Sequence, residues 1–241
     1  MKTVLVTGGT RGLGLATTRR LARDGYHVVA TGRQPSDELT TLASTCKDGK
    51  VTFVRLDLSH AEAVRPFIRE LTSSHGPLYG LVNNAALGHD GVLATMHESE
   101  IAELVQVNLT SAILLTKYGM RSMLTQRDGR IVNVASIIAS TGFSGLSVYA
   151  ATKSALIGFS KSLAREAGKS GITVNTVSPG YMKTRMTEAV QGSKLETIQR
   201  RSPLGRLAHV NDVAGAISFL MGDEGRSITG TDLTIDAGST A

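Results

Sequence analysis

Cysteine and aromatic residues are scarce in this sequence. Its single cysteine, Cys46, cannot form an internal disulfide, so we expect the protein to work in a reducing compartment. Aromatic residues make up only 4% of the chain, and the basic residues are scattered rather than gathered in tracts. Because nucleic-acid surfaces combine basic patches with aromatic stacking residues, we expect no nucleic acid partner and keep one only as a minor alternative. The net charge of +6 still allows a phosphorylated ligand or an acidic partner protein.

Long apolar runs are also missing. Residues 131–152 carry no Asp, Glu, Lys or Arg, yet the stretch contains several polar or small residues, among them Asn133, Ser140 and Ser144. A bilayer-spanning helix needs about 20 predominantly apolar residues, and this stretch is too polar for that. No signal-peptide pattern precedes the apolar run 3–6. We therefore expect a soluble, cytoplasmic protein with no membrane partner.

Apolar runs alternate with helical patterns along all 241 residues. The expected strands are 3–6, 27–31, 51–56, 78–82, 131–135, 172–177 and 233–235. The expected helices are roughly 12–24, 36–46, 60–74, 98–125, 148–168 and 210–221. Continuous apolar strands separated by helices predict an α/β fold, a doubly wound parallel seven-stranded sheet of the Rossmann type. We expect one domain over 1–241, since a second is not needed, with a substrate loop at about 180–205.

A glycine-rich turn follows the first expected strand and opens the first expected helix. Gly8, Gly12 and Gly14 follow the spacing GxxxGxG and would keep Cβ atoms away from a pyrophosphate lying on the helix N-terminus. A tight turn without a ligand is the alternative. The strand before the turn and the helix after it favour dinucleotide binding.

The second expected strand ends at Thr31-Gly32-Arg33, where an NAD-binding site usually has a carboxylate. Arg33, together with Arg11 in the glycine-rich turn, places two cations where a 2′-phosphate would lie, and guanidinium groups suit phosphate well. We therefore predict NADP(H) as the cofactor and no metal. A merely solvated arginine is the alternative at either position.

Tyr149 and Lys153 form a YxxxK pair thirteen residues after Ser136. On a helix, residues four apart share a face, so Lys153 could lower the pKa of the Tyr149 phenol from its usual value near 10. A phenol tuned in this way is a usable general acid or base. Alone, the pair could be an ordinary surface pair; with the glycine-rich turn it predicts a redox site.

Together these motifs resemble the short-chain dehydrogenase/reductase family along the whole chain. The matching elements are 7–14, Asp57-Leu58, Asn83-Asn84-Ala85-Ala86, Asn108, Ser136, Tyr149, Lys153 and Pro179-Gly180. Segments 158–166, 171–175 and 228–230 look like the bacterial β-ketoacyl-acyl-carrier-protein reductases within that family. The Ala86 that ends the Asn-Asn-Ala turn departs from the family's usual glycine.

The resemblance implies four catalytic residues. Tyr149 would donate the proton, and Ser136 would hydrogen-bond the substrate carbonyl oxygen. Lys153 would bind the nicotinamide ribose and depress the pKa of Tyr149, and Asn108 would hold a water that links Lys153 to solvent. Two of them have plain alternatives: Asn108 could be a satisfied core amide, and Ser136 could cap the strand end.

The resemblance also implies the residues around the cofactor. Asp57 would accept from the adenine amino group, although it could instead cap the turn that follows it. Thr184 would hold the nicotinamide carboxamide, and Asn83 would tie the central strands. The full expected cofactor-binding set is Gly8, Thr10, Arg11, Gly12, Leu13, Gly14, Arg33, Asp57, Leu58, Asn84, Ala85, Tyr149, Lys153, Pro179, Gly180 and Thr184.

Partners are also expected from the resemblance. In the β-ketoacyl subgroup two arginines flank the entrance and grip an acidic carrier protein. Arg130 would match the first, and the second falls near Ser170, where the arginine is absent and Lys169 is adjacent. The resemblance also suggests a homotetramer built on the helices near 98–125 and 148–168.

The leading hypothesis is an NADPH-dependent carbonyl reductase acting on a β-ketoacyl thioester, with an acyl carrier protein as a candidate presenter of the substrate. One alternative is an NADP-dependent dehydrogenase or reductase for another secondary alcohol or ketone, such as a steroid, quinone, polyketide or sugar. A second alternative, from another class, is a non-enzymatic dinucleotide-sensing scaffold. A non-enzymatic scaffold would be expected to have lost Tyr149, Lys153 or Ser136, and this sequence keeps all three. Residues 87–96 and 181–200 are expected to shape the substrate pocket.

Overall fold

Seven strands form one parallel sheet in this computed structural model, which describes residues 1–184 and 193–241. Their side chains are mostly buried, which is why apolar residues continue along each strand rather than alternate. The strands are β1 (Thr3–Val6), β2 (His27–Gly32), β3 (Lys50–Arg55), β4 (Leu78–Asn83), β5 (Gly129–Val134), β6 (Ile172–Pro179) and β7 (Asp232–Ile235). The seven-stranded sheet predicted from the sequence is thereby confirmed.

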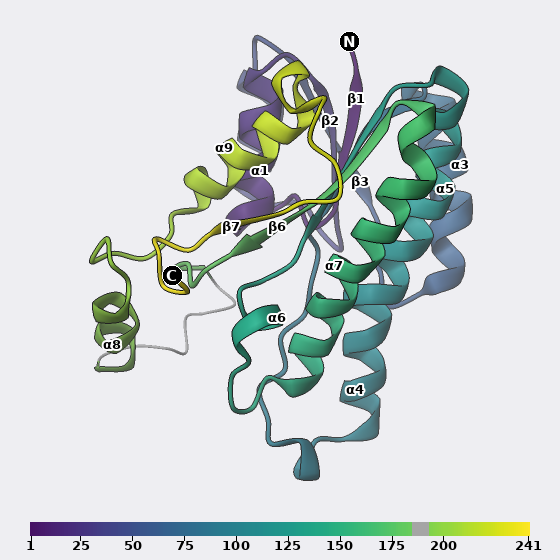
Figure 1. Cartoon of the computed structure of the whole chain (residues 1–241). Coiled ribbons are helices and arrows are strands. Elements are labelled where there is room, and N and C mark those ends of the chain that lie inside the picture. The colour runs from purple at the N-terminus through teal and green to yellow at the C-terminus, as the bar shows by residue number, and fades with distance from the viewer. Residues whose placement is uncertain (185–192) are drawn as a thin grey trace.

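The strand order is β3-β2-β1-β4-β5-β6-β7. After β1, the strands β2 and β3 are added on one side. The chain then returns to the other side of β1, where β4 to β7 are added in order. The order therefore reverses between β1 and β4, and open sheets of this kind bind ligands beyond the carboxyl ends of the strands at that point. All strands point the same way, so these carboxyl ends gather at one edge of the sheet, the lower end in Figure 1.

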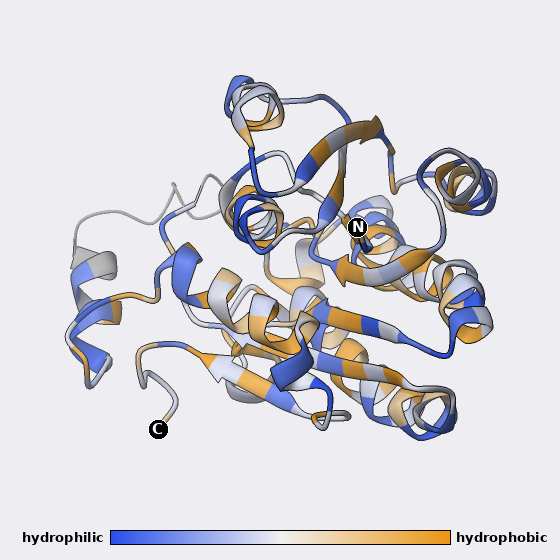
Figure 2. Ribbon diagram, turned by 90° about the horizontal axis from the view of Figure 1, so that it is seen from above, coloured by the Kyte–Doolittle hydropathy of each residue, from blue (hydrophilic) through white to orange (hydrophobic). Residues whose placement is uncertain are grey.

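Helices cover both faces of the sheet (Figure 1). One face carries α1 (Gly12–Arg23), α2 (Asp37–Thr45) and α9 (Val210–Met221). The other carries α3 (Val64–His75), α5 (Ser111–Gln126) and α7 (Ser147–Ala167). Helix α4 (Glu98–Val105) packs against α7 and extends below the end of the sheet in Figure 1. Each face has its own apolar core, and Figure 2 shows the strands, largely orange, lying between the two layers of helices. This two-layer covering gives one doubly wound domain.

Three elements differ from the sequence prediction. The helix expected over 98–125 is interrupted by a π-helical turn, Gln106–Thr110, which separates α4 from α5. A short helix, α6 (Ile138–Thr141), follows β5, and α8 (Ser193–Arg201) lies within the segment expected as a loop at about 180–205. Residues 185–192 of that expected loop lie outside the described residues. Within the described residues, no helix is long and apolar enough to cross a membrane.

Candidate active site

The residues singled out from the sequence meet at the carboxyl edge of the sheet. The glycine-rich turn follows β1, Asn84 follows β4, Ser136 follows β5, and Gly180 follows β6. Helix α7 begins at the same edge and carries Tyr149 in its first turn. Residues as far apart in sequence as Gly8 and Gly180 are therefore brought to one edge by the parallel strand directions.

The glycine-rich turn is shaped so that only glycine fits at its critical positions. Gly8 and Gly12 have φ values of +63° and +52°, in the left-handed region that favours glycine. A Cβ on Gly14 would lie 2.0 Å from the Gly8 carbonyl oxygen, so any side chain there would break the turn. Arg11 is the N-cap of α1 and supplies no side-chain cap to the helix amide groups. These features form a cradle that suits a pyrophosphate group.

Asn84 and Thr7 hold this turn against β4. The Asn84 side chain donates to the carbonyl oxygens of Thr7 (2.9 Å) and Gly8 (3.3 Å). The backbone amides of Asn84 and Ala85 both donate to the Thr7 hydroxyl, each at 3.0 Å. The side chain of Asn84, expected to bind the cofactor, therefore holds the backbone of the glycine-rich turn in place through these hydrogen bonds. The sequence motif found the residue but not this partner.

The two arginines expected near a 2′-phosphate are both exposed at the carboxyl edge. Arg11 lies in the glycine-rich turn and Arg33 directly after β2. The Thr10 carbonyl accepts a hydrogen bond from the Ser36 hydroxyl (2.6 Å), and Ser36 also caps α2, so the glycine-rich turn and the start of α2 are joined. A phosphate placed here would meet two guanidinium groups and no carboxylate at the end of β2.

Asp57 makes the local contacts that its plainer alternative predicted. One carboxylate oxygen accepts from the Ser59 amide (3.1 Å) and hydroxyl (2.8 Å). These hydrogen bonds, and the charge of Arg33 to a smaller extent, lower the pKa of Asp57. The next residue, Leu58, is buried, and its carbonyl accepts from the Ser111 hydroxyl at 2.8 Å. Asp57 therefore stays ionised beside Arg33, with its other carboxylate oxygen making no hydrogen bond within the described residues.

Tyr149 and Lys153 lie together, but the expected effect of Lys153 on the tyrosine is not found. Burial raises the pKa of Tyr149, and only its hydrogen bond with the Ser136 side chain lowers it. The Lys153 ammonium lies 5.7 Å from the centre of the tyrosine ring and donates instead to the Val134 carbonyl at 2.7 Å. In the chain by itself the Lys153 ammonium is directed at the strand end, and its expected lowering of the phenol pKa stays a prediction.

Lys153 is nevertheless an unusual group. It is 2% exposed, and burial lowers its pKa from 10.5 to about 8. Val134 supplies the one hydrogen bond to this ammonium that the structure records. A buried cation with a single neutral acceptor is costly unless a ligand adds further partners. The small number of hydrogen-bond acceptors around the Lys153 ammonium is the strongest sign of a ligand at the carboxyl edge.

Asn108 lies in the π-helical turn between α4 and α5. Its side chain accepts from the Leu87 amide (2.7 Å) and donates to the Leu87 carbonyl (2.9 Å), so it grips the chain that follows β4. Its amide also lies 3.3 Å from the Thr152 hydroxyl, next to Lys153 in sequence. Such π-turns are frequent at functional sites. The side chain is satisfied, as the plainer alternative held, and the expected link through water remains a prediction.

The remaining expected residues close the site from the β6 side. A Cβ on Gly12 would lie 3.6 Å from the Thr184 methyl group, so Thr184 faces the glycine-rich turn. Gly180 packs against Asp236, where a Cβ would meet the Asp236 Cβ at 2.6 Å. The Pro179 carbonyl accepts from the Ile137 amide at 3.1 Å. Leu13, also expected near the cofactor, lies in the first turn of α1 and is buried in the core on that face of the sheet.

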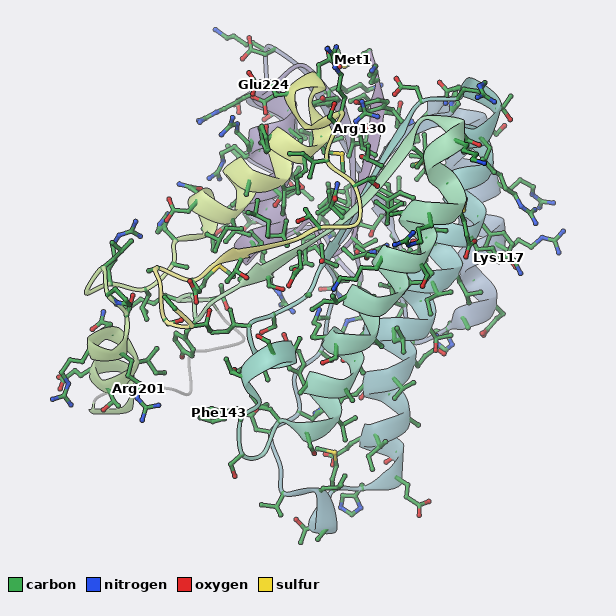
Figure 3. The ribbon with its side chains drawn as sticks, viewed as in Figure 1. Met1, Lys117, Arg130, Phe143, Arg201 and Glu224 are labelled. Carbon is green, nitrogen blue, oxygen red and sulfur yellow. The ribbon has the colours of Figure 1, made fainter. Side chains whose placement is uncertain are left out.

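The structure contradicts the expected role of Arg130 at the entrance. Arg130 is the second residue of β5 and is only 5% exposed; its guanidinium group pairs with Asp128 at 3.1 Å and lies over the Tyr79 ring. Figure 3 shows it near Met1, at the opposite end of the sheet from Phe143. Lys169 precedes β6 at that same far end. Neither residue can flank the entrance to this chain's own site, because Arg130 lies at the amino end of β5 and Lys169 precedes β6.

A rim of exposed apolar side chains lies at the carboxyl edge. Val92 and Leu93 are 64% and 55% exposed, as expected for a segment that shapes a pocket, and Phe143 is 63% exposed. The Gly91 amide donates to the Gly145 carbonyl at 3.0 Å, which joins the two segments. Phe143 was not predicted from the sequence; the signal available there was a large apolar residue between Gly142 and Gly145, shortly before Tyr149.

Comparisons with known proteins agree with this geometry. A family model described as "Enoyl-(Acyl carrier protein) reductase" matches residues 8–240. A short-chain dehydrogenase/reductase from Serratia marcescens superposes with a TM-score of 0.91 at 33% identity, over 100% of this chain and 98% of that one. The chain belongs to the short-chain dehydrogenase/reductase family. As a member it is an oxidoreductase of carbonyl and alcohol groups.

Individual relatives are similar over nearly their whole length. The 3-oxoacyl-[acyl-carrier-protein] reductase FabG of Haemophilus influenzae is 38% identical, over 98% of this chain and 97% of the relative. An acetoacetyl-CoA reductase from Acinetobacter is 35% identical over the same shares. A short chain dehydrogenase from Burkholderia cenocepacia, solved in complex with NADP, is 35% identical with a TM-score of 0.91, over 100% of this chain and 98% of that one. The family and subgroup resemblance stated from the motifs is confirmed.

Proposed function

We propose that this enzyme uses NADPH to reduce the ketone of a 3-oxoacyl thioester to the 3-hydroxyacyl product. The observation that carries the proposal is the convergence of Tyr149, Ser136 and Lys153 beside the glycine-rich turn at one edge of the sheet. The relatives support it, since two that are similar over nearly the full length are named as a 3-oxoacyl-[acyl-carrier-protein] reductase and an acetoacetyl-CoA reductase.

The residues present fit NADP(H). The turn from Gly8 to Gly14 leaves backbone amides open to the pyrophosphate, and Arg11 and Arg33 would hold the 2′-phosphate. Lys153 would complete its hydrogen bonds on the nicotinamide ribose, and Thr184, facing Gly12, would lie by the carboxamide. The relative solved with NADP supports the same choice of cofactor.

When bound, the cofactor supplies a hydride to the carbonyl carbon, and the chain supplies the proton and the orientation. Ser136 would donate a hydrogen bond to the carbonyl oxygen as negative charge develops there. Tyr149 would then donate its phenolic proton to that oxygen, which completes the alcohol. Because burial raises the pKa of Tyr149, the phenol is protonated at neutral pH, which suits an acid in the reductive direction.

The substrate we infer has an apolar part beyond the ketone. Val92, Leu93 and Phe143 are large apolar side chains left exposed around the site, and an acyl chain would cover them. A carrier-free substrate is the second candidate, such as a coenzyme A thioester or another apolar ketone. The burial of Arg130 favours it, because the expected cationic grip at the entrance is missing from this chain.

We also propose that the enzyme is a cytoplasmic homotetramer in which α4, α5 and α7 form contacts between subunits. Val105 on α4 and Leu124 on α5 are more than a third exposed although apolar, which suits a covered surface. Light scattering coupled to size-exclusion chromatography would measure the mass of the assembly. A monomeric mass at micromolar concentration would contradict this part of the proposal.

The test of the proposed function is NADPH oxidation at 340 nm with a panel of acetoacetyl thioesters, quinones, steroids and simple diketones. Tyr149→Phe should retain the fold and NADPH binding but lose about 10²–10⁴-fold in kcat, because it removes only the proton donor. Circular dichroism and NADPH titration serve as controls for the variant. Near-wild-type kcat of the Phe variant on the best substrate would contradict the role of Tyr149.

A further inference from the structure

A network of hydrogen-bonded, buried amide and hydroxyl side chains runs over β4 and β5 and joins α5 to α7. The cross-strand pair Asn83 of β4 and Asn133 of β5 is joined by a 2.7 Å hydrogen bond from one side-chain amide to the other. Asn133 in turn donates to the Ser160 hydroxyl of α7 at 2.8 Å. Asn83 also donates to the Thr116 hydroxyl of α5 at 3.0 Å. All four side chains are at most 4% exposed.

This hydrogen-bonded network has two ends, which lie on different helices. The α5 end stops at Thr116, on a helix that contributes none of the candidate catalytic side chains. The α7 end continues: Ser160 donates to the Leu156 carbonyl at 2.8 Å, within the helix that carries Tyr149 and Lys153. The two ends are therefore matched in chemistry and burial but differ in what they hold.

The Ser160 link lies close to the candidate catalytic residues along both elements. Asn133 immediately precedes Val134, whose carbonyl accepts the Lys153 hydrogen bond. Ser160 lies seven residues after Lys153, which is two helical turns, or about 10 Å, along the same face. Two polar links thus fix α7 on β5, one at Lys153 and one at Ser160. The second fixes how far α7 lies along the strand.

We infer that the hydrogen bond between Asn133 and Ser160 makes Ser160 a positioning residue, which holds α7 along β5 so that Tyr149 and Lys153 face the reacting carbonyl. The inference rests on the proposed function. Apolar packing alone lets a helix slide and rotate on a sheet by small amounts, whereas a directional hydrogen bond between buried groups does not. A displacement of about 1 Å at a catalytic group can cost on the order of 10²-fold in rate.

The experiment compares Ser160→Ala with Thr116→Val, which removes the hydroxyl at the other end of the same network. Ser160→Ala should lower Tm by a few degrees, since it removes the hydroxyl that accepts from the buried Asn133 amide. Thr116→Val should lower Tm by less, since the Asn83 amide keeps Asn133 (2.7 Å) and the Ala112 carbonyl (3.5 Å) as acceptors. Ser160→Ala should also lower kcat by about tenfold or more and shift the pH profile of kcat, with the Kd for NADPH within about twofold of wild type. Thr116→Val should leave kcat and its pH profile unchanged.

Equal losses of kcat in the two variants, or an unchanged kcat and pH profile in Ser160→Ala, would overturn the inference. Ser160→Cys, which keeps the volume and a weak hydrogen-bonding group, should recover part of the lost kcat, and it is the variant to use if Ser160→Ala does not fold. A wild-type enzyme with no NADPH-dependent activity on any ketone would instead refute the proposed function. The two failures are therefore distinguishable.

Discussion

Arg33→Asp is the change that tests the cofactor assignment most directly. Arg33 lies exposed after β2, and its charge contributes to lowering the pKa of Asp57. Because it is exposed and holds no buried partner among the described residues, its replacement should leave the fold intact. The carboxylate would repel a 2′-phosphate and accept from ribose hydroxyls, which reverses the local preference.

The expected magnitude follows from one lost charge-assisted contact. Such a contact contributes about 1.5–3 kcal/mol, and about 1.4 kcal/mol corresponds to a factor of ten in affinity. The Kd for NADPH should therefore rise about ten- to a hundredfold, nearer the lower figure because Arg33 is exposed to screening by solvent and salt. The Kd for NADH, which lacks the phosphate, should stay unchanged or fall.

The assay is a fluorescence titration of both nucleotides against wild type and variant at fixed ionic strength. Arg69→Asp, an exposed position on α3 away from the glycine-rich turn, makes the same change in net charge and should alter neither affinity. The reasoning would be refuted by a wild-type protein that binds NADH more tightly than NADPH. It would be refuted equally by an Arg33 variant whose two affinities fall together.

Two further predictions concern buried titratable groups. Lys153→Met should abolish turnover yet leave Tm equal to or above that of wild type. The change removes a buried cation, and burial lowers the pKa of that cation to about 8. A large fall in Tm would contradict this prediction. Burial, and Lys50 to a smaller extent, lowers the pKa of His27 from 6.5 to about 4, so the unfolded chain takes up a proton at higher pH than the folded chain. The free energy of unfolding should therefore fall as pH drops from about 6.5 towards 4, and Tm measured over this window should fall less for His27→Gln.

The strands could be predicted from sequence to within two residues at most ends. Buried parallel strands carry continuous apolar runs bounded by polar residues, glycine or proline, as 3–6 (between Lys2 and Thr7) and 78–82 (between Pro77 and Asn83) show. The site could be located for a related reason. Parallel strands bring their carboxyl ends to one edge, so residues that follow different strands, such as Gly8 and Ser136, must lie near each other.

Contacts between side chains distant in sequence could not be predicted in this way. Arg130 matched a motif by its position in the sequence, but only the packing of Tyr79 and the start of β5 shows that it is buried at the wrong end of the sheet. The direction of the Tyr149 pKa shift depends on burial and on where the Lys153 ammonium points, and neither follows from an i, i+4 spacing.

The sequence by itself therefore determined the fold, the edge at which the candidate site lies and the candidate residues that gather there. These depend on periodicity and on local spacing, which a single chain displays directly. The tertiary structure decided which groups are satisfied and which are held in place. Ser160 is an ordinary helical serine in the sequence; its partner Asn133 lies 27 residues earlier, and only the packing of α7 on β5 brings the two together.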